Sequence, residues 1–461
     1  MSLDVIASAL HADLPPLLAR HQVPGAVLAV YADGEQIDLA HGVLNIRTGV
    51  EATTDSLFQV GSITKVWTTT LIMQLADEGR LELDAPVRRY LPAFRLGSEA
   101  AAAAVTIRQL LCHTGGFEGD LFTDTGRGDD CVARFVASLG DTPQLFPPGT
   151  MLSYNNAGFA VLGRVIEVLH GRPFDEVLRT CLAEPLGVRA FATDAYEAIL
   201  HRAAVGHIRP SAGAPLAPAR IWSLPRSNAP AGSMLAMSAA DLLLFARMHL
   251  AGGDHLVSPD AVKAMQQRAA DRPAPGMPGG GWGLGWEILD DGGSVIGHDG
   301  GTIGQAAFLR VVPDRDVAIA LLTNGGDAAS LYWSLVPPLI HALTGVRLPP
   351  PATLPPVPAP FDASRYLGVY SSRVADLTIS QDAAGRVWLD DAPKGIFTQL
   401  GPPSPPQELV HLTGDTLIAR TPEGVVHPVY AFLGADPEGR SLYLHGGRAT
   451  RRAPSAGARR V

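Results

Sequence analysis

The chain of 461 residues is too long for one ordinary hydrophobic core, so its length predicts two domains, one large and one small. A formal net charge of −9 offers no basic surface for nucleic acid, and no segment is long and apolar enough to span a bilayer. We therefore expect a globular protein with neither a nucleic-acid partner nor a membrane-spanning segment.

The N-terminal segment and the cysteines indicate in which cellular compartment the protein resides. Residues 1–21 lack a positively charged start followed by an apolar stretch and a small-residue cleavage site, so no signal peptide is predicted. Cys112, Cys131 and Cys181 are an odd number and widely spaced, which fits free thiols in a reducing environment. Together these features predict a cytoplasmic protein.

Strand and helix patterns mix in the first part of the chain. Residues 26–44 read as two strands joined by the turn signal Asp33-Gly34. From Ser62 onward, apolar residues recur with a period of about 3.6 until Gly79, which predicts a helix. Further helices are predicted at 106–112, 157–169, 174–183 and 238–250, and a pair of strands at 306–313 and 316–323.

A proline-rich run, Leu348–Pro360, predicts a stiff linker, because proline lacks an amide donor and restricts the residue before it. Beyond it, short strand patterns separated by turn residues predict a small antiparallel barrel or sandwich. The basic end of the chain favours a solvated tail, although Arg448, Arg451 and Arg452 could meet a carboxylate. The predicted organisation is a large domain over 1–347, a linker over 348–360, a barrel over 361–453 and a tail over 454–461.

Lys65 stands three residues after Ser62 in a chain whose only other lysines are Lys263 and Lys394. A desolvated lysine can lose its proton near neutral pH and act as a base, whereas arginine cannot. On a helix the two side chains share a face, and the helix N-terminus would stabilise an alkoxide on Ser62. Taken alone, the pair also fits an N-capping serine followed by a solvated lysine.

Two further stretches place polar side chains at element boundaries. Tyr154, Asn155 and Asn156 stand between a proline-glycine turn and an apolar helix. A phenol beside an ammonium group can be driven toward phenolate and serve as a base, while an amide can orient a substrate. His298 opens a glycine-rich stretch beside a strand, where a ligand could approach the backbone. A core tyrosine with capping asparagines, and a histidine at an ordinary hairpin, are the alternative interpretations.

In order and spacing, Ser-Ile-Thr-Lys, Tyr-Asn-Asn and His-Asp-Gly resemble the three active-site motifs of the serine β-lactamase and penicillin-binding-protein superfamily. Its class C-like branch is the most similar, since residues 110–117 and 231–245 resemble further segments of that branch. The resemblance covers roughly residues 24–344. It implies an α+β, β-lactamase/transpeptidase-like fold, with an antiparallel sheet packed by helices and an all-helical lobe. The strands after the linker resemble the lipocalin-like barrel attached to some of these enzymes.

The resemblance also implies a role for each residue of the first two motifs. Ser62 would be acylated, and Lys65 and Tyr154 would exchange protons. Asn156 would help to bind the substrate amide. Whether Lys65 or Tyr154 is the general base stays open. The resemblance implies no metal and no other cofactor.

The third motif departs from that of penicillinases and D,D-carboxypeptidases, which usually carry Lys-Thr-Gly and attract a carboxylate with the lysine. Here it is His298, Asp299 and Gly300, as in esterases, amidases and peptide-cyclising thioesterases of the superfamily. A mostly neutral imidazole beside an aspartate binds a carboxylate poorly, so β-lactamase activity is not expected. The resemblance implies that the backbone amides of Ser62 and Gly301 form the oxyanion hole and that this stretch binds substrate.

The resemblance is greatest to the stand-alone penicillin-binding-protein-type thioesterases. It implies that a nonribosomal peptide, with a D-configured C-terminal residue, passes from a carrier-protein thioester to Ser62 and leaves as a head-to-tail macrocycle. A carboxylesterase, or a D-amino-acid amidase or D,D-peptidase-like hydrolase, would use the same acyl-enzyme on a small ester or amide. A peptide-binding pseudoenzyme is a further alternative, against which the presence of Ser62, Lys65 and Tyr154 speaks.

Overall fold

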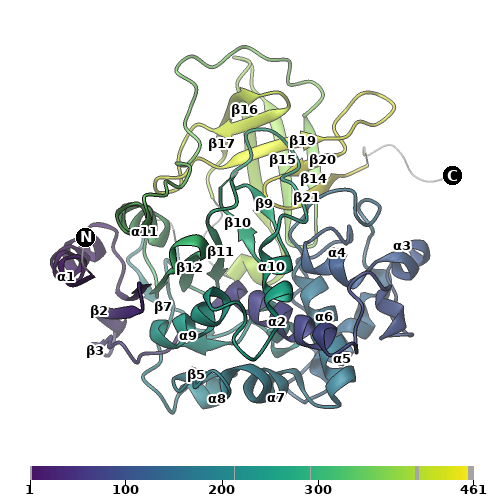
Figure 1. Ribbon diagram of the computed structural model, residues 1–461. Coiled ribbons are helices and arrows are strands. Elements are labelled where there is room, and N and C mark those ends of the chain that lie inside the picture. The colour runs from purple at the N-terminus through teal and green to yellow at the C-terminus, as the bar shows by residue number, and fades with distance from the viewer. Residues whose placement is uncertain (1–2, 212, 291, 400–403, 455–461) are drawn as a thin grey trace.

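The computed structural model describes residues 3–211, 213–290, 292–399 and 404–454 (Figure 1). An eight-stranded antiparallel sheet with helices on both faces forms the lower part in Figure 1, and a closed eight-stranded antiparallel barrel lies above it. The β-lactamase/transpeptidase-like fold with a C-terminal barrel, expected from the sequence, is thereby confirmed. Within the described residues, no helix combines the length and apolar character required to cross a membrane.

The sheet has the order β3-β2-β1-β13-β12-β11-β10-β9, and each strand is antiparallel to its neighbours. The predicted hairpin and the predicted pair of later strands are confirmed in it. The strands are β1 (Gly25–Ala32), β2 (Glu35–Asn45), β3 (Val50–Glu51), β9 (Gly281–Trp282), β10 (Glu287–Ile288), β11 (Ile296–Gly301), β12 (Ala306–Val312) and β13 (Val317–Thr323).

The central strand β1 is buried on both faces of the sheet. Val27 and Ala29 belong to one core with residues of α2 and α9, while Leu28 and Val30 belong to another with residues of α1 and α11. This follows from the strand period of two, which turns successive side chains to opposite faces. The helices are α1 (Leu3–Arg20), α2 (Thr64–Asp77), α9 (Ala239–Leu250) and α11 (Ala328–Thr344).

A helical lobe packs beside the sheet and confirms the helices predicted at 106–112, 157–169 and 174–183. Its elements are η2 (Val87–Arg89), α3 (Glu99–Ala104), α4 (Ile107–Leu111), α5 (Cys131–Ala137), η3 (Ser138–Asp141), α6 (Asn156–His170), α7 (Phe174–Leu178), the π-helical η4 (Arg179–Ala183) and η5 (Arg226–Ala231). Smaller elements are β4 (Phe58–Gln59), η1 (Gly61–Ile63), β5 (Phe191–Ala192), α8 (Ala195–Ala198), β6 (His207–Ile208), β7 (Ala217–Pro218), β8 (Ala236–Met237), α10 (Pro259–Gln266) and η6 (Pro313–Arg315).

The barrel closes through β21 (Ala449–Arg452), which pairs with both β14 and β20. The expectation that the chain is a solvated tail from Arg448 onward is therefore wrong for these residues; residues 455–461 lie outside the described part. The Arg452 guanidinium covers the Tyr370 ring at 4.7 Å, which explains a basic residue in a barrel strand. The remaining elements are β14 (Gly368–Ser371), β15 (Ala375–Gln381), β16 (Val387–Pro393), η7 (Gly395–Gln399), β17 (Gln407–Thr413), β18 (Thr416–Ala419), β19 (Val429–Leu433) and β20 (Tyr443–His445).

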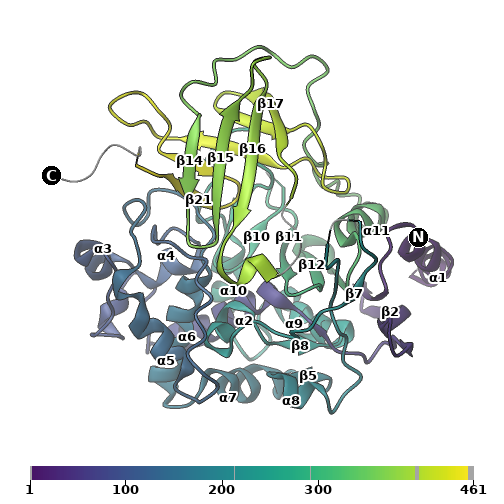
Figure 2. The same cartoon turned by 180° about the vertical axis from the view of Figure 1, so that it is seen from behind.

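The barrel rests on the segment that leads into α6 (Figure 2). The Tyr154 amide donates to the Gly447 carbonyl at 3.1 Å, and the Ala449 amide donates to Ser153 Oγ at 3.0 Å. Residues 348–360, the predicted linker, contain no helix or strand. The exact domain boundaries stay predictions. What matters for the site is that backbone atoms of the barrel hold Ser153 and Tyr154.

Candidate active site

Ser62 lies in η1, directly before α2, and Lys65 lies in the first turn of α2. The Lys65 Nζ atom donates to Ser62 Oγ at 3.0 Å and to the Ala231 carbonyl at 2.5 Å. Lys65 is fully buried, so the alternative of a solvated lysine is wrong. Burial, assisted by the charge of Arg448, lowers the pKa of Lys65 well below its usual value. The site therefore favours a neutral amine beside the serine hydroxyl.

Close backbone packing holds the Ser62 turn between β11 and the turn that follows η5. A Cβ atom on Gly300 would stand 1.9 Å from the Val60 carbonyl oxygen, and one on Gly61 would stand 2.7 Å from the Gly301 amide nitrogen. A Cβ on Gly232 would stand 2.1 Å from the Gly61 carbonyl oxygen. Only glycine permits such approaches, so these positions fix where Ser62 lies relative to β11.

Tyr154 lies beside this pair, with the Lys65 Nζ atom 4.9 Å from its ring centroid. Burial raises the pKa of Tyr154, and the nearby Ser62 side chain and the Arg448 guanidinium oppose that rise. The Tyr154 hydroxyl is buried and forms no hydrogen bond with any described residue. Because burial also disfavours the charge of Lys65, the resting site favours a protonated phenol rather than the phenolate that the sequence suggested.

His113, which the sequence analysis did not single out, packs against Tyr154 with ring centroids 4.3 Å apart. The Asn155 amide donates to His113 Nδ1 at 3.0 Å, so this imidazole carries its proton on Nε2. The Trp282 ring packs edge-on against the rings of His113 and His298, with ring centroids 4.8 and 5.6 Å apart. The rings of His113, Trp282 and His298 therefore pack around Tyr154. His113 lies within residues 110–117, which resemble a segment of the class C-like branch, and this resemblance is the sequence feature that could have marked His113 as a site residue.

His298 lies on β11, on the face of the sheet that meets α2 and Tyr154, with its ring 6.1 Å from that of Tyr154. Its Nδ1 donates to the Asp299 carbonyl at 2.7 Å, and its buried Nε2 has no partner among the described residues. Burial first, and then the charge of Lys65, lower the pKa of His298 to about 3. The imidazole is therefore neutral, as the sequence suggested.

Asp299 does not join this group. Its carboxylate pairs with Arg310 at 2.6 Å, and Arg310 is itself buried and donates to the Tyr332 hydroxyl of α11 at 2.8 Å. Glu287 stands nearby, and burial together with the charge of Asp299 raises its pKa to about 7. This network lies on the α11 side of the sheet, so the structure places Asp299 behind the strand that carries His298.

Arg448, from the turn before β21 of the barrel, reaches into the site. Arg448 Nε pairs with the Asp120 carboxylate, and Asp120 Oδ1 accepts a hydrogen bond from Asn156 Nδ2 at 2.6 Å. The Arg448 guanidinium also stands 4.7 Å from the Tyr154 ring centroid. Asn156 lies at the start of α6, and its side chain is bound by Asp120, which sequence reasoning missed. Asp120 is bound in turn by Arg448, which the sequence analysis left in a tail. Arg451, by contrast, is exposed.

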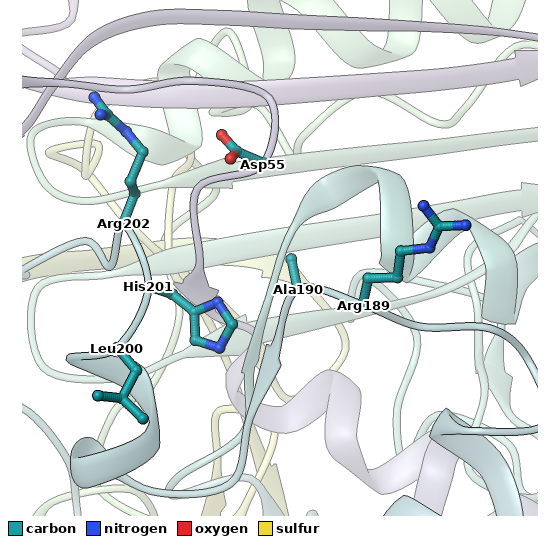
Figure 3. Close-up of a pocket in the computed structure, with 6 residues that line it drawn as sticks. All are labelled: Asp55, Arg189, Ala190, Leu200, His201 and Arg202. Atoms are coloured by element: carbon teal, nitrogen blue, oxygen red, sulfur yellow. The ribbon is translucent and has the colours of Figure 1, made fainter.

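The structure also contains a hollow apart from these residues, with a volume of about 450 Å³ (Figure 3). No residue of the three motifs lines it. It is open at the surface and combines two arginines, a histidine and an aspartate with small and apolar side chains. Its lining residues are Asp55, Arg189, Ala190, Leu200, His201 and Arg202.

A beta-lactamase family model matches residues 10–331, which is more than half of the chain. The chain belongs to the beta-lactamase family. The three motif residues Ser62, Lys65 and Tyr154 all lie inside the matched range.

Relatives in this family extend the comparison. The chain is 45% identical to penicillin-binding protein 4 of Amycolatopsis lactamdurans over 365 residues, which is 77% of this chain and 94% of that protein. It is 32% identical to the esterase EstB of Burkholderia gladioli over 40% of this chain and 50% of that one. As a member of this family with an esterase relative, it is a serine hydrolase or acyltransferase.

Among solved structures, the chain is similar to SurE with a TM-score of 0.77 and 32% identity, covering 98% of this chain and 100% of that one. A structure of SurE with D-Leu gives a TM-score of 0.75 and 32% identity over 97% and 99% of the two chains. Both comparisons include the barrel as well as the β-lactamase-like part.

Proposed function

We propose that this chain is a trans-acting thioesterase that releases a nonribosomal peptide from a carrier protein as a head-to-tail macrocycle. The observation that carries the proposal is the buried Lys65 amine, 3.0 Å from Ser62 Oγ, in a site whose third motif supplies a neutral imidazole. This arrangement suits the transfer of an uncharged acyl group, because the third motif has a neutral imidazole where a lysine would attract a substrate carboxylate.

In the acylation step, the Lys65 amine takes the proton of Ser62 while Oγ attacks the thioester carbonyl carbon. The new C–O bond forms, the C–S bond breaks, and the leaving thiolate receives a proton from Tyr154 or Lys65. The backbone amides of Ser62 and Gly301 stabilise the oxyanion. Apart from Gly301 itself and the residues on either side of it in the chain, no described residue lies within 4 Å of where a Cβ on Gly301 would stand, which leaves room for the acyl group there.

In the release step, the free amine at the other end of the peptide attacks the same carbonyl carbon. A C–N bond forms, the bond to Ser62 Oγ breaks, and the amine proton returns to Oγ through Lys65 or Tyr154. Asn156 is the amide that orients the peptide, because its Nδ2 is already held by Asp120. No charged product group has to be bound at any step.

A D-configured residue at the peptide C-terminus is part of this proposal. The similarity to SurE over nearly the whole chain, barrel included, and the structure of SurE with D-Leu support it. A plain esterase is the second candidate, because the esterase EstB shares 32% identity with part of this chain. The two candidates use one acyl-enzyme and differ in whether an amine or water accepts the acyl group.

The test is the product mass from a short peptidyl thioester with a free N-terminal amine and a C-terminal D-residue. The proposal predicts a product lighter than the free acid by one water. Free acid alone, with rapid cleavage of aryl esters, would assign the chain to the esterases. The Ser62→Ala variant is the control, and normal turnover in that variant would refute the acyl-enzyme altogether.

A further inference from the structure

Two aromatic rings meet where the segment after β16 of the barrel touches the catalytic part of the chain. Phe397, in η7 between β16 and β17, packs edge-on against Phe122 with ring centroids 5.4 Å apart. Both side chains are half-buried. Figure 2 shows the chain after β16 running down from the barrel into the lower part of the molecule.

The start of this connection is fixed. The Lys394 Nζ atom pairs with Asp376 at 2.5 Å and donates to Ser371 Oγ at 3.0 Å. The Lys394 amide donates to the Val374 carbonyl at 2.7 Å. The Lys394 Nζ atom also donates to the Ser372 carbonyl at 3.1 Å, so these contacts fix the barrel end of the segment that leads to Phe397.

Phe122 belongs to a segment that borders the catalytic residues. Asp120 binds Asn156 and Arg448, Leu121 belongs to the core, and Phe122 follows directly as a half-buried side chain. The Leu121 carbonyl accepts from Asn228 Nδ2 at 2.9 Å.

The element that holds this segment is η5, and it also reaches the nucleophile. Ser227 Oγ donates to the Thr123 carbonyl at 2.7 Å, while the last residue of η5, Ala231, accepts from Lys65. One short helix thus joins the Phe122 segment to the Ser62–Lys65 pair.

We propose that Phe122 and Phe397 form one apolar wall of the acyl-enzyme site, which keeps water from the Ser62 ester and so directs it to the amine of the peptide. This inference rests on the proposed function, and it names the side chains that decide whether the acyl-enzyme is cyclised or hydrolysed. The acyl-enzyme carbonyl can react with water, forming a C–O bond and a free acid, or with the amine, forming a C–N bond and the ring. In both cases Ser62 Oγ leaves and regains its proton, so only access distinguishes the two.

The experiment measures the ratio of cyclic product to free acid from the same peptidyl thioester. Phe397→Ala and Phe122→Ala should each lower this ratio about five- to tenfold, and the ratio is read from the two products whatever the total rate of thioester consumption. The double variant should fall no further than the larger single effect, because the two rings act together. Phe397→Leu, which keeps an apolar side chain, should retain most of the wild-type ratio.

Trp388→Ala is the matched control, since Trp388 is an aromatic residue of the same barrel that contacts Arg386 and Asp382 within it. The proposal of an apolar wall would be wrong if folded Phe397→Ala kept the wild-type ratio of cyclic product to free acid. It would also be wrong if Trp388→Ala lowered this ratio as much as Phe397→Ala does. If the wild type makes only free acid, the cyclase proposal fails. The wall is then tested with an aryl ester and added glycinamide, where Phe397→Ala must still shift the partition toward water.

Discussion

A neutral lysine next to a serine is the residue-scale feature on which the chemistry depends. Lys65 is enclosed by the first turn of α2, the end of η5 and the ring of Tyr154, and its two hydrogen bonds go to an uncharged hydroxyl and a carbonyl. No carboxylate of the described residues forms a salt bridge with it. Burial without an ion pair is what lowers the pKa of a lysine.

Replacing Lys65 by methionine should lower kcat by roughly 10²–10⁴-fold, the range for losing a general base, and should stabilise the fold at neutral pH. In the folded chain the pKa of Lys65 lies below its unfolded value, so the unfolded chain binds the extra proton and stability rises with pH between the two values. The stability gained by Lys65→Met should therefore shrink as the pH approaches 10.

Urea unfolding of the two proteins at pH 6, 8 and 10 measures this difference. Lys263→Met is the matched control, because Lys263 is exposed and its replacement should leave activity and stability nearly unchanged. A stability difference between wild type and Lys65→Met that is the same at every pH would contradict a buried neutral amine.

At the scale of elements, β11 and η1 form one unit through backbone contact. The glycines of β11 let its backbone touch that of residues 60–61, and this sets the position of the Ser62 and Gly301 amides. On the other face of the sheet, the Arg310 pair with Asp299 ties β11 to β12 and, through Tyr332, to α11. The oxyanion hole in our proposal is therefore built on the short helix η1 and the strand β11.

Gly300→Ala should lower the free energy of unfolding by about 1–3 kcal/mol and abolish most activity, because its Cβ would overlap the Val60 carbonyl and force the two segments apart. Gly301→Ala is the neighbouring control, since its Cβ would meet nothing within 4 Å, and it should change stability by less than about 0.5 kcal/mol. Urea unfolding compares them, and equal stabilities of the two variants would contradict the close packing.

The sequence predicted those elements whose pattern follows the rules of local structure. The 3.6-residue period and the stop at Gly79 located α2, and the Asn155 cap with Gly171 at the other end bounds α6. The helices α1 and α11 went unpredicted because each contains two adjacent prolines, which normally argue against a helix. Burial of one apolar face against the sheet outweighs that local cost.

At the scale of the whole molecule, the barrel contributes to the candidate active site. The side chain of Arg448 touches Asp120 and Tyr154, and the main chain of β21 and the turn before it holds the residues that lead into α6. Sequence reasoning could place Ser62, Lys65, Tyr154, Asn156 and His298 because motifs mark them. Asp120 and Arg448 meet across more than half of the chain, and no local pattern records such a contact.

Arg448→Ala should lower kcat/KM several-fold at pH 7, with recovery as the pH rises. The positive charge of Arg448 lowers the pKa of Lys65, so its removal raises that pKa and moves the acid limb of the pH profile to higher pH. Arg451→Ala, at an exposed position of β21 three residues later, should leave the profile unchanged. An equal loss at every pH would show that Arg448 acts by contact alone.

The late position of Arg448 in the chain also has a consequence during protein synthesis. Domains generally fold as they emerge from the ribosome, so the sheet and its helices can form while the barrel is still being made. About a hundred residues separate the predicted linker from Arg448, which at 5–20 residues per second delays completion of the site by on the order of ten seconds. Ser62 thus acquires the neighbouring charge of Arg448 only after the chain has been translated through residue 448.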